Sequence, residues 1–236
     1  MDDKPQDACL RYYGISPWEI EVLYGLLNDK FTVVQEETGY GEIPMTEATP
    51  TYAGSSKIVD PDTRDWQGNE TDPDTVSLLI ITIPVQFSEE FFQWFGFKRW
   101  EKMKSIIKEM KRRRGNRKAI RVEIIFKNEE WNCYREGRQN DGGPILSSND
   151  ERLPDYPHIK FVIDSSENHI FNSAIEKIDF VVELLPYHLN HSKMKKWCKK
   201  PMIVRYDYDV HSSKWYVGHV LSFDGGMTFS IDDLRN

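Results

Sequence analysis

The run of residues 76–87 constrains the fold of this chain more than any other feature. It consists of Val-Ser-Leu-Leu-Ile-Ile-Thr-Ile-Pro-Val-Gln-Phe, and a run rich in β-branched and apolar residues favours an extended strand. Its length suits a strand and falls well short of the roughly 20 apolar residues that cross a bilayer. We therefore expect a buried strand at the centre of a folded domain.

A helix is predicted directly after this strand, over residues 89–114, with a bend near Gly96. Residues 88–90 (Ser-Glu-Glu) place acids in the first turn, where the helix dipole favours negative charge. Residues 112–115 (Arg-Arg-Arg-Gly) place cations in the last turn, followed by a glycine that suits a helix C-terminus. Both ends of the helix are thus marked in the sequence.

The N-terminal segment contains a second well-marked helix. Residues 16–19 (Ser-Pro-Trp-Glu) form a capping box with proline at the first helical position, and Ile20, Leu23, Tyr24 and Leu27 follow at helical spacing. Shorter patterns predict the remaining elements. We expect strands over 31–35, 119–127, 159–163, 178–185, 203–210, 215–222 and 228–231, and helices over 171–176 and 188–199.

These elements predict an α+β fold, because strands outnumber helices and the two do not alternate regularly. We expect a mixed or mainly antiparallel sheet of about six strands, packed by two main helices and joined by an N-terminal helical segment. We expect an N-terminal helical segment over 1–35, a polar loop or linker over 36–75 that is rich in Pro and Gly, and a main α+β domain over 76–236.

The chain has no feature of a secreted or membrane protein. Residues 1–5 are acidic and no apolar stretch follows them, so we expect no signal peptide. The cysteines, Cys9, Cys133 and Cys198, are odd in number and widely separated, which suits a reducing compartment. We expect a cytoplasmic protein without a membrane partner.

The charge of the chain is unevenly distributed. Residues 98–121 contain twelve Lys or Arg and two acids, a local charge of +10, whereas the whole chain carries −7. Such a block is typical of proteins that bind nucleic acid, because Lys and Arg neutralise phosphates and release counterions. The residues predicted to bind are Lys104, Lys108, Lys111, Arg112, Arg113, Arg114, Arg117 and Lys118, here named the basic strip.

Two other interpretations of the basic strip remain open. Its cations can pair with the excess acids of the chain and form a solvated helix face, or they can contact an acidic protein partner. A second lysine-rich cluster, over residues 193–200, adds weight to polyanion binding only if it lies on the same surface.

The aromatic run 91–100 gives a further interpretation. It places aromatic side chains on every side of a helix, which indicates burial on more than one face. Most of these side chains would belong to the core, and an oligomer contact is the alternative.

Metal and catalytic sites find little support in the sequence. The histidines, among them His158, His169, His188 and His191, lack the paired spacing of a zinc site. Asp179 and Glu183 would face the same side of the strand predicted over 178–185, near Asp164, as in a metal-dependent nuclease. The accompanying nuclease motif is absent, as are nucleophile-elbow and phosphate-loop motifs. We expect no metal and no cofactor.

One local pattern is similar to a known motif. Residues 222–229 (Ser-Phe-Asp-Gly-Gly-Met-Thr-Phe) resemble the Asp-box, Ser-x-Asp-x-Gly-x-Thr-Trp, with Phe in the last place. In proteins that carry it, this box is a β-hairpin turn in which short polar side chains cap backbone groups. The resemblance implies a hairpin between residues 215 and 231 and identifies no enzyme.

The leading hypothesis is therefore a non-enzymatic cytoplasmic binding or adaptor protein whose basic strip contacts DNA, RNA or another polyanion. The first alternative is a protein–protein assembly component, a homo-oligomer or a binder of an acidic protein, that uses the aromatic helix 91–100. The second is a divergent metal-dependent nuclease or hydrolase that uses Asp164, Asp179 and Glu183.

Overall fold

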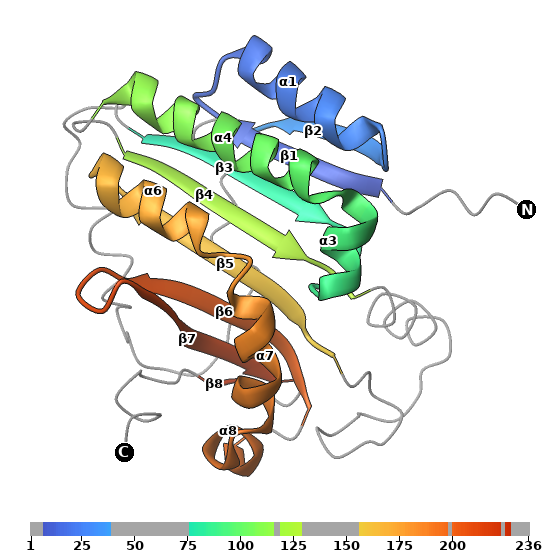
Figure 1. Cartoon of the computed structure of the whole chain (residues 1–236), viewed down its shortest axis with the longest axis vertical. Coiled ribbons are helices and arrows are strands. Elements are labelled where there is room, and N and C mark those ends of the chain that lie inside the picture. Colours follow the sequence, from blue (N-terminus) through green and yellow to red (C-terminus); the bar gives the residue numbers. More distant parts are fainter. Residues whose placement is uncertain are drawn as a thin grey trace, which may run out of the picture.

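The computed structural model describes residues 7–38, 76–115, 119–128, 156–197, 200–222 and 225–227. The strands in these ranges form one sheet in the order β2-β1-β3-β4-β5-β6-β7-β8 (Figure 1). Their bounds are β1 Asp7–Tyr13, β2 Thr32–Glu37, β3 Val76–Ile83, β4 Ala119–Phe126, β5 His158–Ser165, β6 Pro201–Asp209, β7 Lys214–Ser222 and β8 Gly225–Met227.

The sheet is mixed and is built from three strand–helix–strand units. The pairs β1–β2, β3–β4 and β5–β6 are each parallel and each is connected through helices. Antiparallel pairing joins one unit to the next, β1 to β3 and β4 to β5, and attaches β7 and β8. The predicted α+β class with a mixed sheet is thus confirmed.

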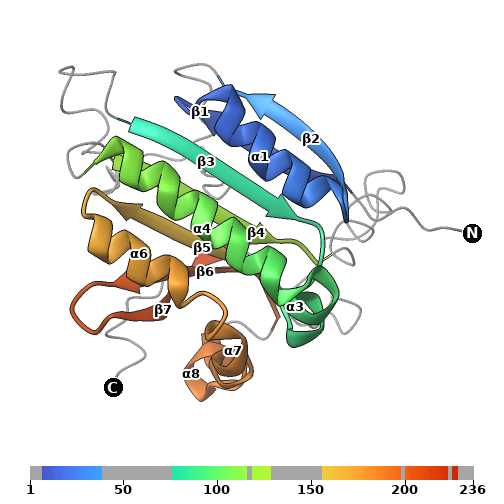
Figure 2. The same ribbon diagram turned by 45° about the horizontal axis from the view of Figure 1, so that its top comes forward.

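The helices pack on one face of the sheet, which gives two layers (Figures 1 and 2). Their bounds are α1 Pro17–Asn28, α3 Glu89–Phe95, α4 Phe97–Arg114, α6 Asn168–Glu176, α7 Val181–Asn190 and α8 Ser192–Trp197. None of these helices combines the length and the apolar character that a membrane crossing requires.

The core lies between the two layers. Alternate strand residues face the helices and are buried, as Leu79, Ile81 and Ile83 are on β3, because successive strand side chains point to opposite faces. Aromatic rings fill one end of the core, where the rings of Phe87 and Phe126 lie 4.8 Å apart.

The predicted helix over 89–114 is divided at Gly96. Ser88 caps α3 by accepting a hydrogen bond from the amide of Phe91 (3.3 Å), and the backbone N–H of Gly96 donates to the carbonyl of Phe92. Gly96 has φ +91°, a conformation that costs glycine little and other residues more. At the predicted bend, α3 therefore ends and α4 begins.

Local predictions differ from the structure over residues 178–199 and at the N-terminus, and the helix predicted over 188–199 is divided between the end of α7 and α8. The strand predicted over 178–185 is wrong: Val181–Asn190 is helix α7, with Val181 and Leu185 buried one turn apart. A short apolar run fits a buried helical segment as well as a strand, and periodicity alone does not separate them. Conversely, β1 was not predicted, although Ala8, Leu10 and Tyr12 alternate as a strand with one buried face.

At the C-terminal side of the described sheet, β7 and β8 pair antiparallel, with Ser222 opposite Gly225. The resemblance to the Asp-box implied a hairpin here, and the antiparallel pairing of these two strands agrees with it, whereas residues 223–224 lie outside the described residues. The strand predicted over 228–231 lies outside the described residues, as do residues 39–75 of the predicted linker.

Candidate functional site

The three lysines of the basic strip on α4, Lys104, Lys108 and Lys111, follow one flank of the helix, and two of them are buried. Trp100, Met103, Ile107 and Met110 face the sheet, as their apolar periodicity predicts, but Lys104 and Lys111 are buried as well. The flank that carries Lys104, Lys108 and Lys111 meets α6, which packs beside α4 (Figure 2).

Lys104 is almost completely buried between helices, with 2% of its side chain exposed. Its Nζ lies 2.7 Å from Glu101 Oε1, 3.2 Å from Asp179 Oδ1 and 3.5 Å from Glu176 Oε2. Burial acts to lower the pKa of Lys104, but the carboxylates of Glu101 and Asp179 outweigh it and hold that pKa above its usual value. Lys104 is therefore charged and joins α4 to the α6–α7 connection.

Lys108 and Lys111 continue this seam towards the end of α4. Lys108 Nζ donates to Glu176 Oε1, and this contact lowers the pKa of Glu176. Lys111 is fully buried and its Nζ donates to the carbonyls of Gly115 (2.7 Å) and Ser166 (2.6 Å). Burial and the neighbouring Arg114 lower the pKa of Lys111. Both lysines thus donate hydrogen bonds to oxygen atoms of their own chain.

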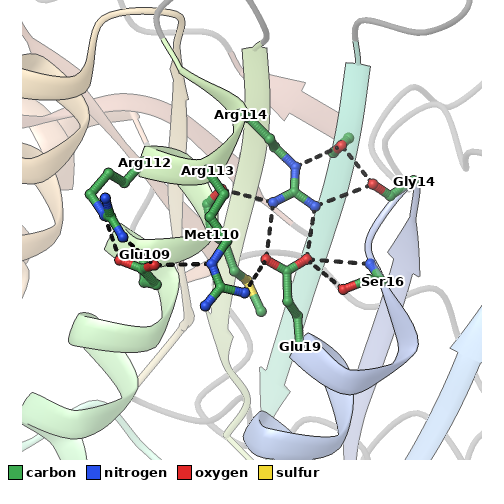
Figure 3. A network of polar contacts seen from close by, with 9 residues as sticks. Gly14, Ser16, Glu19, Glu109, Met110, Arg112, Arg113 and Arg114 are labelled. Carbon is green, nitrogen blue, oxygen red and sulfur yellow. Dashed lines mark hydrogen bonds and ion pairs between the residues drawn. The ribbon is translucent and has the colours of Figure 1, made fainter.

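Arg112 and Arg113 share one acid on the last turns of α4 (Figure 3). Arg112 Nε donates to Glu109 Oε2 (2.7 Å) and Arg113 Nε donates to Glu109 Oε1 (3.0 Å). These hydrogen bonds lower the pKa of Glu109 to about 2. The side chains of Arg112 and Arg113 are 73% and 40% exposed, respectively. The guanidinium of Arg113 also lies over the ring of Trp18, with its Cζ 4.0 Å from the ring centroid.

Arg114 points away from solvent and connects α4 to the N-terminus of α1 (Figure 3). Its Nη2 lies 3.1 Å from Glu19 Oε2, and it also donates to Ser77 Oγ and to the carbonyls of Met110 and Gly14. The same Glu19 carboxylate accepts from the backbone N–H of Ser16 (3.3 Å). Arg114 therefore belongs to the helix-cap network and not to an open surface.

Arg117 and Lys118, the last members of the basic strip, lie outside the described residues. The other six each contact a carboxylate or a carbonyl oxygen of this chain. A phosphate would have to compete with these oxygens, because a cation that binds the phosphate loses some of its existing hydrogen bonds or ion pairs within the chain. Of the six, Arg112 and Arg113 are the most exposed.

Apart from Glu101 and Glu109, which lie on α4 itself, the acids that neutralise the basic strip could not be identified from the sequence. Glu19, Glu176 and Asp179 stand far from α4 in the chain, and only the packing of α1 and α6 against α4 brings them to its cations. The excess of acids outside the basic block was the one available indication.

The aromatic run 91–100 divides between core and surface. The rings of Phe91, Phe92, Phe95 and Trp100 are buried, whereas Trp94 and Phe97 are exposed. Core packing accounts for most of the run.

A second apolar surface lies on α7. Phe180, Leu184 and Tyr187, which follow each other at intervals of four and three residues, are 60%, 44% and 75% exposed. That spacing puts them along one side of the helix, next to the buried side that holds Val181 and Leu185. The stripe could be predicted from the sequence only if residues 181–190 were recognised as helical.

We name Phe180, Leu184 and Tyr187 the apolar patch.

The predicted nuclease carboxylates do not form a group. Asp164 lies on β5, Asp179 contacts Lys104 and precedes α7, and Glu183 is exposed on α7. The expectation that Asp179 and Glu183 share one side of a strand is wrong, because this segment is helical. Among the described residues, no three His, Cys, Asp or Glu side chains could together hold a metal ion.

The face of the sheet opposite the helices carries its own ion pairs. Glu123 on β4 is buried between Lys160 Nζ (2.7 Å) and Arg121 Nη2 (2.9 Å). Burial raises the pKa of Glu123, but these two cations outweigh it and hold the pKa below its usual value. On β6, Arg205 Nε lies 2.8 Å from Asp207 Oδ1. These pairs balance positive with negative charge.

Comparison of the chain with protein-family models, with curated proteins and with solved structures finds no match in any of the three.

Proposed function

We propose that this chain is a protein–protein assembly component that self-associates through the apolar patch. One observation carries the proposal: Phe180, Leu184 and Tyr187 form an exposed stripe on α7. Contiguous apolar side chains on a surface are typical of protein contacts, since burying them removes apolar area from water.

The charges on either side of the stripe favour a second copy as the partner. Glu183 is exposed near the start of α7, and Lys195 is exposed on α8, beyond its end. Two copies related by a twofold axis present the same surface to each other. If their α7 helices lie antiparallel, the acidic end of one faces the basic end of the other.

Sedimentation velocity over a wide range of protein concentration tests the proposal. We expect dimers to form as concentration rises, and the substitutions Leu184→Ser and Tyr187→Ser to abolish them. Val210→Ser is the matched control, because Val210 is an exposed apolar residue outside the patch. A wild-type chain that stays monomeric at all concentrations would contradict the proposal.

A charge exchange separates the antiparallel arrangement from other contacts. We expect Glu183→Lys alone to weaken the dimer, because it would place lysine against Lys195 of the other copy. Adding Lys195→Glu should restore it, since each opposite-charge pair is formed again. Failure of the double variant to recover would reject this arrangement of the helices while leaving the patch itself under test.

Polyanion binding is the second candidate, supported by the exposure of Arg112 and Arg113 at the end of α4. Replacing both by Ser removes the two most exposed described cations of the basic strip and leaves the largely buried Arg114 in place. Binding to single- and double-stranded DNA and RNA probes should weaken with salt and with this double variant if the surface binds phosphates. Equal binding by variant and wild type would remove this candidate.

A cytoplasmic location belongs to the same proposal. Cys9 carries a free thiol, and an unpaired cysteine suits a reducing compartment.

A further inference from the structure

Among the described strands, β2 forms one margin of the sheet. It stands at the end of the strand order, and within the described part of the chain it pairs with β1 alone. Its side chains are exposed, apart from Val33, which is half-buried. Edge strands present backbone N–H and C=O groups that can pair with another chain. β2 forms six residues of such an edge at the margin of the sheet (Figure 1).

The backbone groups that point outwards can be assigned. The N–H of Thr38 donates to the carbonyl of Tyr12 at 2.9 Å, on the β1 side. In an extended strand the N–H and C=O of one residue point to the same side, and successive residues alternate. Val34 and Glu36 therefore pair with β1 in the same way as Thr38, and Val33, Gln35 and Glu37 direct their backbone groups outwards.

The edge has few of the devices that usually prevent pairing. β2 contains no proline, and its register with β1 runs without a shift from Thr32 to Glu37. Charged side chains occur only at its C-terminal end, as Glu36 and Glu37. By contrast, the described strand at the opposite margin, β8, has three residues.

The side chains of β2 indicate which partner fits. Glu36 lies on the face of Arg11, whose Nε it contacts at 2.7 Å, and Glu37 points to the opposite face. An added strand would thus meet a carboxylate on each face of the sheet at neighbouring positions. Cross-strand pairs of opposite charge are favourable, so two consecutive cations are complementary, and the net charge of −7 attracts a cationic segment.

We propose that the outer edge of β2 is a strand-addition site for an extended segment of a partner protein that carries two consecutive Lys or Arg residues. Backbone hydrogen bonds to Val33, Gln35 and Glu37 give affinity, and the two glutamates give specificity. This site is separate from the apolar patch, because β2 and α7 lie at opposite ends of the molecule (Figure 1).

The test uses a fluorescein-labelled peptide, Thr-Val-Thr-Lys-Lys-Val-Thr, and its counterpart with two Glu in place of the two Lys. Fluorescence anisotropy should show saturable binding of the lysine peptide and at least about tenfold weaker binding of the glutamate peptide. The variant Glu37→Lys should reduce this preference. Equal binding of the two peptides, or no binding of the lysine peptide at millimolar concentration, would overturn the proposal.

Gln35→Pro distinguishes strand addition from general attraction between charges. The Gln35 amide points outwards, so proline there removes an edge donor and spares the hydrogen bonds to β1. We expect a circular dichroism spectrum like that of the wild type and at least about tenfold weaker binding. A folded Gln35→Pro variant that binds like the wild type would reject the site.

Hydrogen exchange locates the bound peptide. The amides of Val33, Gln35 and Glu37 should exchange more slowly when the lysine peptide is bound, whereas Val34 and Glu36, already paired with β1, should change little. Protection confined to any other strand or helix would overturn the proposal, whatever the affinity.

Discussion

Arg114 and Glu19 join the end of α4 to the start of α1. Their side chains are 12% and 6% exposed, with Arg114 Nη2 3.1 Å from Glu19 Oε2. The Glu19 carboxylate that pairs with Arg114 also completes the capping box of α1, because it accepts a hydrogen bond from the backbone N–H of Ser16. One acid therefore both begins a helix and neutralises a buried cation that lies 95 residues further along the chain.

Substitution of Glu19 should strongly reduce the stability of the folded protein. Glu19→Ala removes the cap and leaves Arg114 with only neutral acceptors, so we expect the free energy of unfolding to fall by about 2–4 kcal/mol. Glu19→Gln keeps a capping-box side chain but loses the charge, and should cost less. Urea unfolding of the three proteins measures the order; equal losses for the two variants would contradict the dual role.

The three consecutive arginines should separate into two classes. Arg114→Gln is expected to cost about 1–3 kcal/mol, because it leaves the buried Glu19 carboxylate with weaker partners. Arg112→Ser and Arg113→Ser, whose ion pairs with Glu109 lie at the surface, should each cost clearly less than Arg114→Gln. Thermal or urea unfolding of each single variant decides this, and three similar losses would show that exposure does not govern the cost.

Local signals in the sequence predicted most single elements. The capping box placed α1, the acid-first and cation-last pattern placed the helices over 89–114, and β-branched runs placed β3 and β4. These signals act within a few residues, so they do not depend on the rest of the fold. The apolar run 178–185 lacked such a signal and was assigned to the wrong structure.

The surroundings of the basic strip required tertiary structure. The positive block is visible in the sequence, but Glu176 and Asp179 approach Lys104 only because α6 packs against α4. Similarly, the exposure of Tyr187 depends on which side of α7 meets the sheet. Charge patterns thus identify a surface that needs partners, and packing decides whether the chain supplies them itself.

Gly218 marks a bulge between β6 and β7. Arg205 opposes His219 and Tyr206 opposes Val217, so Gly218 is the additional residue. A Cβ atom there would collide with the carboxylate of Asp207, which holds Arg205. Gly218→Ala should therefore destabilise the protein by about 1–3 kcal/mol.

A double-mutant cycle with Asp207→Ala tests this cause. Shortening Asp207 removes the atoms that the new methyl group meets first, so the cost of Gly218→Ala should fall by about 1 kcal/mol in that background. Additive losses would show that backbone conformation, and not the Asp207 carboxylate, requires glycine.

His158 should make the protein sensitive to mild acid. Its Nδ1 accepts a hydrogen bond from the backbone N–H of Asn128 (2.9 Å), which requires this nitrogen to be unprotonated. Burial, with the charge of Lys127, lowers the pKa of His158 from 6.5 to about 4. Between these pH values the unfolded chain binds a proton that the folded chain does not, so stability is complete above pH 6.5 and is lost as pH falls towards 4.

The expected loss down to pH 4 is about 3 kcal/mol from His158 alone, since its pKa falls from 6.5 to about 4 and one pKa unit corresponds to about 1.4 kcal/mol. His158→Asn keeps an acceptor for the Asn128 amide through its side-chain carbonyl and cannot be protonated. Urea unfolding at several pH values from neutral down to about pH 4 measures the free energy of unfolding. This free energy should fall less steeply with decreasing pH in the variant than in the wild type. The carboxylates titrate alike in both proteins, so parallel pH profiles would show that His158 contributes nothing to the acid sensitivity.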